Sequence, residues 1–114
     1  MMKIREIARQ LNLQVLAGEK ELDREVSDGY CSDLLSDFMA NGTAGCLWLT
    51  LQTHVNVVAV ALLTGAAGVV VTGGRQVAAE VCRKAEEEGL PLLATNCRTY
   101  ETAGQLYHLL QGEQ

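Results

Sequence analysis

The stretch Gly68-Val69-Val70-Val71-Thr72-Gly73-Gly74-Arg75 decides the fold. Three consecutive valines are β-branched and apolar on both faces, which is typical of a strand buried inside a parallel sheet. The glycine pair allows a turn with positive φ, and a helical pattern begins near Gln76. The stretch therefore predicts a strand–turn–helix corner. Such a corner presents free N–H groups and the positive end of a helix dipole, which together suit an anion.

The same unit is expected three times in succession. The expected strands are Cys46–Thr50, Val69–Thr72 and Leu92–Thr95, and the helices that follow them cover about residues 57–63, 76–88 and 99–110. Each strand is nearly continuous in apolar residues and ends in threonine, which favours a parallel sheet flanked by helices. Because crossovers between parallel strands are right-handed, the three threonines are expected at the carboxyl edge, where open α/β sheets bind ligands.

The beginning of the chain predicts an amphipathic helix over Met2–Leu11, since apolar residues recur at i, i+3, i+4 and i+7. This segment is similar to the first helix of a helix-turn-helix. However, the next residues, 13–18, alternate and stop at glycine like a strand rather than a recognition helix. The net charge of −5 and the pI near 4.9 also argue against a nucleic-acid partner.

The remaining amino-terminal segment is expected to be hairpin-like, with Val26–Cys31 as a further short strand, and to extend the sheet so that the fold has a mixed edge. Ser32 is expected to cap a helix over Asp33–Met39, with the Asp33 carboxylate in its first turn. Asn41-Gly42 then predicts a left-handed helix end. The expected fold is α/β, with a mainly parallel sheet, flanking helices, and three strand–helix units after an N-terminal helix and hairpin-like segment.

Length and composition favour one domain over residues 1–114, with 48% apolar and 20% charged residues. The four cysteines form no C-x-x-C pair, so buried or half-buried free thiols in a reducing cytosol are expected. The charged, helical N-terminus does not resemble a signal peptide. The longest apolar run, residues 57–63, is too short to cross a bilayer. We therefore expect a soluble, cytoplasmic protein with no membrane partner.

The expected carboxyl edge is rich in hydroxyl and amide groups, which can bind a polar ligand, and Arg75 can donate two hydrogen bonds to a carboxylate or phosphate. The alternative is that these residues only cap three helices, although capping explains Gln52 and His54 less well. The candidate ligand-binding residues are Thr50, Gln52, Thr53, His54, Asn56, Thr72, Gly73, Gly74, Arg75, Thr95 and Asn96.

The sequence contains no P-loop, no G-x-S-x-G elbow and no G-x-G-x-x-G fingerprint. His54 is a lone histidine in a capping loop, so a hydrogen-bonded or solvent-facing role is favoured over a general base or metal ligand. Asp28, Asp33 and Asp37 are better explained by a helix dipole and solvation than by a cation site. We expect no enzyme, no metal and no cofactor, with a His54-based activity as the minor alternative.

Five segments carry a family resemblance: KIREIARQLNLQVLAG (3–18), VSDGYCSDLLSDFMA (26–40), LWLTLQTHVNVVAVAL (47–62), GVVVTGGRQ with AAEVCRKAEEEGLPLLAT (68–95), and YETAGQLYHLL (100–110). With these segments the chain resembles the DRTGG domain family over nearly its whole length. It is thereby similar to the N-terminal domain of HPr kinase/phosphorylase and to a regulatory region of long phosphotransacetylases.

The TGG of the family name matches Thr72-Gly73-Gly74. The Asp-Arg of the name aligns with Thr53-His54, and Asn56 replaces a following acidic residue. If the Asp-Arg pair makes a charged contact in relatives, this chain lacks that contact and binds either something different or nothing. The resemblance implies a regulatory module that self-associates, in a stand-alone form, with a partner protein in redox metabolism.

Two functions remain open at this point. The first is a non-catalytic regulatory module that binds a small anionic or nucleotide-like ligand at the carboxyl edge and self-associates. The second is a purely structural protein–protein interaction subunit without a small-molecule ligand. The helix around Val55–Leu63 is apolar nearly all round, and burial of such a helix against a second copy predicts a homodimer.

Overall fold

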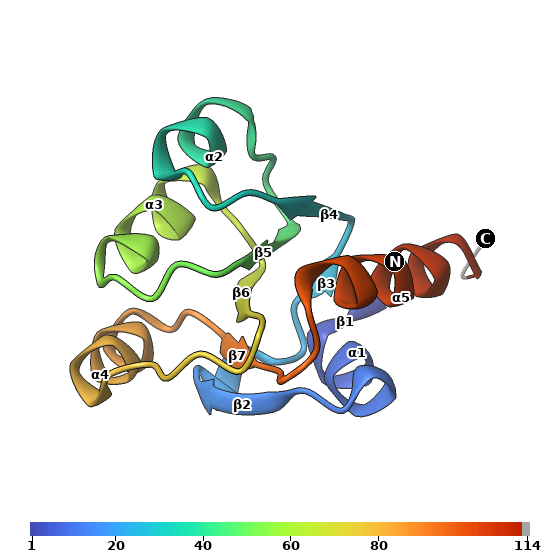
Figure 1. The fold of residues 1–114 in the computed structure, drawn as a ribbon, viewed down its shortest axis with the longest axis horizontal. Coiled ribbons are helices and arrows are strands. Elements are labelled where there is room, and N and C mark those ends of the chain that lie inside the picture. Colours follow the sequence, from blue (N-terminus) through green and yellow to red (C-terminus); the bar gives the residue numbers. More distant parts are fainter. Residues whose placement is uncertain (113–114) are drawn as a thin grey trace.

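The centre of the molecule is a five-stranded sheet with the strand order β2–β7–β6–β5–β4 (Figure 1). The computed structural model describes residues 1–112. The strands β4 (Asp28–Cys31), β5 (Cys46–Thr50), β6 (Gly68–Val71) and β7 (Leu92–Ala94) are parallel to one another. The strand β2 (Gln14–Ala17) pairs antiparallel with β7. The mainly parallel α/β fold and its mixed edge are therefore confirmed.

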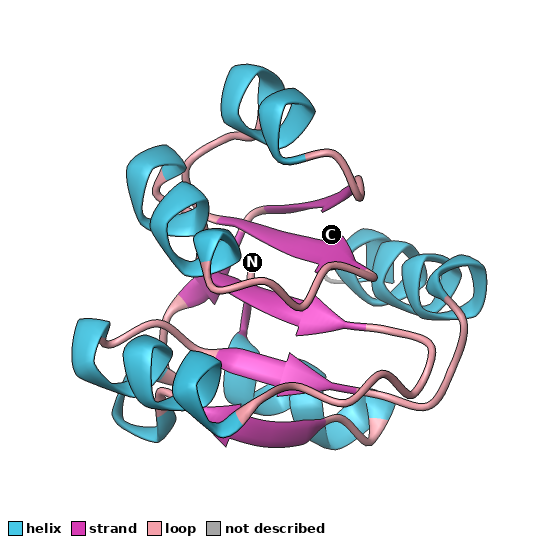
Figure 2. Ribbon diagram, turned by 60° about the vertical axis from the view of Figure 1, so that its left-hand side comes forward, coloured by secondary structure: helices cyan, strands magenta, loops and turns pink. Residues whose placement is uncertain are grey.

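Helices cover both faces of this sheet. One face carries α2 (Leu35–Asn41), α3 (Asn56–Thr64) and α4 (Ala79–Glu88), and the other carries α1 (Ile4–Leu11) and α5 (Thr99–Gly112) (Figures 1 and 2). A small antiparallel pair, β1 (Met2–Lys3) with β3 (Glu25–Val26), lies beside α1, and a short 3-10 turn spans Glu19–Glu21. Within the described residues, no helix combines the length and the apolar character needed to cross a bilayer.

Each face of the sheet has its own core, because successive side chains of a strand point in opposite directions. In β5, Trp48 packs with Phe38 of α2, and the two rings stack with centroids 4.0 Å apart. Leu47 and Leu49 point to the opposite face and pack with Leu106 of α5. Trp48 also donates a 2.8 Å hydrogen bond from Nε1 to the carbonyl of Ser32. These contacts fix α2 and α5 to opposite sides of one strand.

The two expected amino-terminal strands do not form a hairpin with each other. β2 and β4 lie at opposite edges of the sheet. β4 pairs in parallel with β5, and a parallel pair requires a crossover, which α2 supplies. A strand–helix unit therefore also precedes the three that the sequence predicts, and the amino-terminal segment reaches both edges of the sheet.

The start and end of α2 differ from the expected ones. The helix begins at Leu35 rather than Asp33, because the Ser32 hydroxyl accepts a 3.3 Å hydrogen bond from the N–H of Leu34 before the helix starts. Its end at Gly42 has φ −66°, so the expected left-handed stop is wrong. Glycine is needed there for space, since a Cβ would lie 2.7 Å from the Phe38 carbonyl oxygen.

The helix α4 begins at Ala79, three residues later than the pattern near Gln76 indicates. Residues 75–78 form no helix, and Ala78 at the helix start is extended. All four cysteines are free. Cys46 is buried and Cys82 half-buried as expected, whereas Cys31 and Cys97 are exposed, because Cys31 ends the edge strand β4 and Cys97 lies in the loop after β7.

Candidate functional site

The carboxyl ends of the three central strands lie side by side. Thr50 is opposite Val71 in the β5–β6 pair, and Val71 is opposite Ala94 in the β6–β7 pair. The threonines that end these strands therefore stand at one edge of the sheet, as expected. Figure 2 shows the loops after these strands gathered on that edge.

Two of the three threonines are fully buried and stabilise the sheet. The Thr50 hydroxyl donates a 3.1 Å hydrogen bond to the Asp33 carboxylate, which also accepts a 2.7 Å bond from the N–H of Leu51. The Thr72 hydroxyl lies 2.6 Å from the Thr99 hydroxyl at the start of α5. Neither Thr50 nor Thr72 presents its hydroxyl to solvent, so both join the strand ends to neighbouring segments.

The glycine corner is already hydrogen-bonded to the neighbouring loop. Gly73 donates its N–H to the Cys97 carbonyl at 2.8 Å, and Gly74 donates its N–H to the Thr95 carbonyl at 2.9 Å. Both glycines have positive φ, +77° and +70°. The expectation of free N–H groups here is therefore wrong, because the turn after β6 packs against the loop after β7. The helix dipole of α4 also begins only at Ala79.

A polar cavity of about 360 Å³ lies beside this corner. It brings together four of the candidate residues, Gly74, Arg75, Thr95 and Asn96, with six that the sequence analysis missed. Those six are Asn12, Gln14, Leu16, Gln76, Val77 and Ala94. Its volume is within the range of small-molecule sites.

Strand pairing accounts for three of the missed lining residues, Asn12, Gln14 and Leu16. β2 runs antiparallel to β7, with Gln14 opposite Ala94. The beginning of β2 therefore lies beside the end of β7, at the same edge as the three β–α loops. The expected mixed edge was the signal that could have pointed to these residues, since an antiparallel neighbour brings its start to the carboxyl edge.

Arg75 gives this cavity its charge. It is the one charged residue in the lining, and it is exposed. Among the ion pairs between described residues, none includes Arg75. The surrounding side chains of Asn12, Gln76 and Asn96 are amides, which both donate and accept hydrogen bonds. In a chain with net charge −5, an unpaired guanidinium among amides is a local positive charge that can donate hydrogen bonds to a carboxylate or phosphate.

The other seven candidate residues lie outside this cavity. Thr50, Thr72 and Gly73 belong to the strand ends described above, whereas Gln52, Thr53 and His54 lie in the loop between β5 and α3, and Asn56 begins α3. His54 is exposed, and its Nδ1 accepts a 3.0 Å hydrogen bond from the N–H of Asn56, so it caps α3. The Gln52 side chain donates a 2.9 Å bond to the carbonyl of Asp33, and Thr53 is half-buried next to it. Within residues 1–112, no three His, Cys, Asp or Glu side chains are grouped to hold a metal ion.

The fold is similar to a solved regulatory structure. The crystal structure of the CBS and DRTGG domains of the regulatory region of Clostridium perfringens pyrophosphatase, complexed with the activator diadenosine tetraphosphate, matches with a TM-score of 0.71 and 12% identity. The match covers 90% of this chain and 44% of that one. This chain therefore spans less than half the length of the pyrophosphatase fragment.

Sequence comparison gives the family. No curated protein sequence matches the chain. The model of the DRTGG domain matches residues 6–109, and the chain therefore belongs to the DRTGG domain family.

Proposed function

We propose that this DRTGG domain is a non-catalytic regulatory module that binds a small anionic, nucleotide-like ligand at the carboxyl edge of its sheet. The single observation that carries the proposal is Arg75, an unpaired guanidinium in a cavity that is otherwise lined by neutral residues. A guanidinium recognises carboxylate or phosphate by paired hydrogen bonds. The ligand's phosphate or carboxylate is placed on Arg75 and its polar body against Asn12 and Asn96.

Two further observations support this proposal. The pyrophosphatase regulatory region with the same fold was crystallised with a nucleotide activator. In this chain, the Nδ1 of His54 already accepts a hydrogen bond from the N–H of Asn56 at the start of α3. This favours a non-catalytic module over an activity in which that atom transfers a proton. The remaining candidates Gln52, Thr53, His54 and Asn56 are assigned to ordering the loop after β5, beside the site rather than in it.

The test is a thermal-shift screen with AMP, ATP, diadenosine tetraphosphate, acetyl phosphate and small carboxylates. A ligand at 100 times its Kd stabilises the folded state by about 2.7 kcal/mol, which corresponds to roughly 10 °C for a domain of this size. The Arg75→Ala variant is expected to lose the shift. Arg83→Ala, an exposed arginine of α4 outside the cavity, is the matched control and keeps it.

Two results would contradict the proposal. The first is that no anion in the screen raises the melting temperature of the wild-type domain. The second is a shift of equal size in the Arg75→Ala variant, because the ligand would then bind elsewhere.

Self-association through the α2–α3 side of the domain is a second proposal. The large apolar side chains Leu63, Leu34 and Met39 are 75%, 65% and 51% exposed there, and α2 and α3 pack together. Exposed apolar side chains on two neighbouring helices favour a protein interface. Sedimentation at tens of micromolar is expected to give a dimer that Leu63→Glu converts to a monomer. A wild-type monomer would contradict this.

A further inference from the structure

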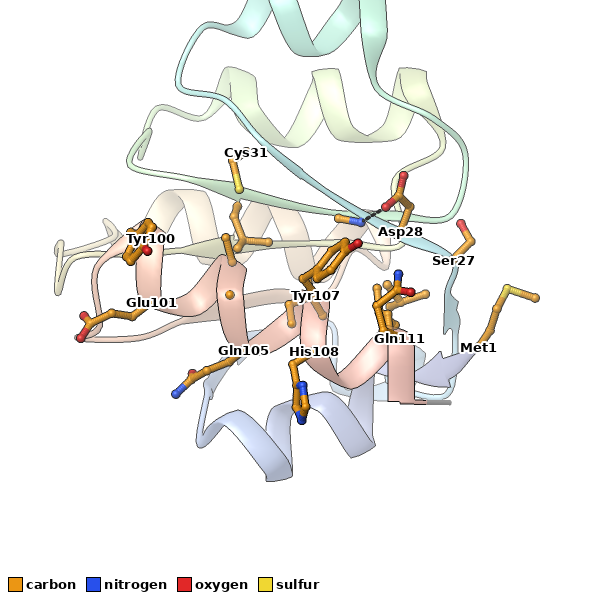
Figure 3. A pocket seen from close by; sticks show the side chains of 17 residues that line it. Met1, Ser27, Asp28, Cys31, Tyr100, Glu101, Gln105, Tyr107, His108 and Gln111 are labelled. Carbon is orange, nitrogen blue, oxygen red and sulfur yellow. Dashed lines mark hydrogen bonds between the residues drawn. The ribbon is translucent and has the colours of Figure 1, made fainter. Parts of the chain in front are cut away.

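A second and larger cavity lies between the edge strand β4 and the helix α5 (Figure 3), and it shares no lining residue with the Arg75 cavity. Its volume is about 930 Å³. The buried side chains of Leu49 and Leu106 are part of its apolar lining, together with Val26. A concave apolar site of this size is typical of a pocket for a small organic molecule.

An open notch in α5 faces this cavity. Tyr100, Gly104 and Tyr107 follow one another at helical spacing along one stripe of α5, and all three line the cavity. The two tyrosines are 84% and 68% exposed. A Cβ added at Gly104 would meet nothing within 4 Å. The exposed rings therefore flank a part of the helix that no side chain of the described structure covers.

Gly104 has no role that the folded domain itself explains. It lies inside a 14-residue helix and its φ is not positive. A glycine in a helix interior costs about 1 kcal/mol relative to alanine. Glycine at such a point permits a close approach to the helix backbone. A flat group lying between the two tyrosine rings is the occupant that uses this free space.

The charge next to Tyr107 decides the sign of that occupant. The lining contains two carboxylates, Asp28 and Glu101, and the amino-terminal ammonium of Met1, but no lysine or arginine side chain. Glu101 is paired with Arg98 at 3.5 Å. Asp28 accepts a 2.8 Å hydrogen bond from the N–H of Gly29 and makes no ion pair with another described side chain.

Asp28 and Tyr107 lie on the same side of the cavity. Figure 3 shows Tyr107 extending from α5 toward β4, where Asp28 lies, whereas Gln105 and His108 leave the helix on the side of α1. The lining runs along α5 from Tyr100 at one end of the helix to Met1 at the other, where Met1 lies beyond Ser27. A cation above the Tyr107 ring would thus have a carboxylate within the same stretch of the cavity. Aromatic faces and a carboxylate together attract organic cations.

We propose that the cavity between β4 and α5 is a second binding site, which takes a small organic cation with a flat apolar body. The flat body lies over Gly104 between Tyr100 and Tyr107, and the ammonium group faces Asp28. This site binds a cation, whereas the Arg75 cavity is proposed to bind an anion, so the two sites take different ligands.

The test compares tryptamine with indole-3-propionate, two probes that share the indole ring and carry opposite charges. Binding is followed on the full chain by ¹⁵N NMR titration. Tryptamine is expected to shift the amide signals of Gly29 and Gly104 in a saturable manner, with indole-3-propionate at least ten-fold weaker. Asp28→Asn is expected to weaken tryptamine several-fold and to strengthen indole-3-propionate, because the carboxylate that attracts one probe and repels the other is gone.

Gly104→Leu is the decisive variant, because a Cβ at this position meets no atom within 4 Å and the rest of the leucine side chain would occupy the notch. It is expected to weaken tryptamine at least ten-fold. Gly112→Leu, the same change in the same helix but outside the cavity, is expected to bind like the wild type. Equal binding of the two probes, tryptamine shifts confined to the Arg75 cavity, or unchanged binding by a folded Gly104→Leu variant would each overturn the proposal.

Discussion

Replacement of Asp33 by alanine removes one acceptor that two donors share at the end of β5. The Oδ1 atom of Asp33 accepts hydrogen bonds from the Thr50 hydroxyl at 3.1 Å and from the N–H of Leu51 at 2.7 Å. Thr50 is fully buried, so its hydroxyl would lose its acceptor in a place that water reaches poorly. We therefore expect the Asp33→Ala domain to be folded but clearly less stable.

The size of the loss follows from these two bonds. A hydrogen bond to a charged group contributes about 1.5–3 kcal/mol. Asp33 itself is exposed and Leu51 only half-buried, so water replaces part of the second bond. We expect the free energy of unfolding to fall by about 2 kcal/mol. The unfolding entropy of 114 residues is about 240 cal/mol/K, so the melting temperature should fall by roughly 8 °C.

Trp48 provides the assay, because it is the single tryptophan and is fully buried. Its fluorescence follows urea and thermal unfolding of each variant. Asp33→Asn keeps an acceptor oxygen and should lose about half as much stability or less. Asp23→Ala removes an exposed carboxylate that pairs with Arg5, and a solvent-exposed pair of this kind contributes little to stability.

The reasoning is refuted if Asp33→Ala is no less stable than Asp23→Ala. It is equally refuted if Asp33→Asn and Asp33→Ala lose the same stability, because the retained oxygen would then have no effect.

Three further outcomes are expected. Gly42→Ala should cost about 1–3 kcal/mol in urea unfolding, since its methyl group would lie 2.7 Å from the Phe38 carbonyl oxygen; an unchanged midpoint contradicts this. Gly104→Ala should raise stability by about 0.5–1 kcal/mol, and a lower melting temperature would mean that the helix needs glycine there. Burial raises the pKa of the Cys46 thiol above its ordinary value of 9.0, so the unfolded chain ionises first and stability falls as pH rises above about 9. Cys46→Ala should show a shallower fall between pH 8 and 10, whereas parallel profiles would contradict the assignment.

The central sheet was predictable because its pattern is local. Val69, Val70 and Val71 are apolar in succession and are bounded by glycine, so the strand and its burial on both faces follow from neighbouring residues alone. The shared edge of Thr50, Thr72 and Thr95 then follows from the handedness of parallel crossovers.

The hydrogen-bond partners at that edge were not predictable in the same way. Whether the N–H of Gly73 is free depends on the Cys97 carbonyl, which belongs to the loop after the next strand. Asp33 was expected in a helix turn, but its carboxylate instead binds the end of β5. In each case a tertiary contact supplies a partner that the local pattern does not contain.

The cavity beside Arg75 was predicted only in part, for a related reason. Arg75 and Asn96 follow strands that the sequence identifies, so their place at the edge could be inferred. Asn12 and Gln14 reach the same cavity only because β2 pairs with β7. That pairing joins segments distant along the chain, and no periodicity in either segment specifies it.

The position of β2 also has a dynamic consequence. A ligand that contacts Gln14 and Asn96 together would link the edge strand β2 to the loop after β7. Occupancy would then oppose detachment of the edge strand, and amide hydrogen exchange in β2 should slow more than in β5, which two neighbouring strands already hold. Conversely, a partner or a substitution that detaches β2 from β7 would separate the two halves of the site and release the ligand.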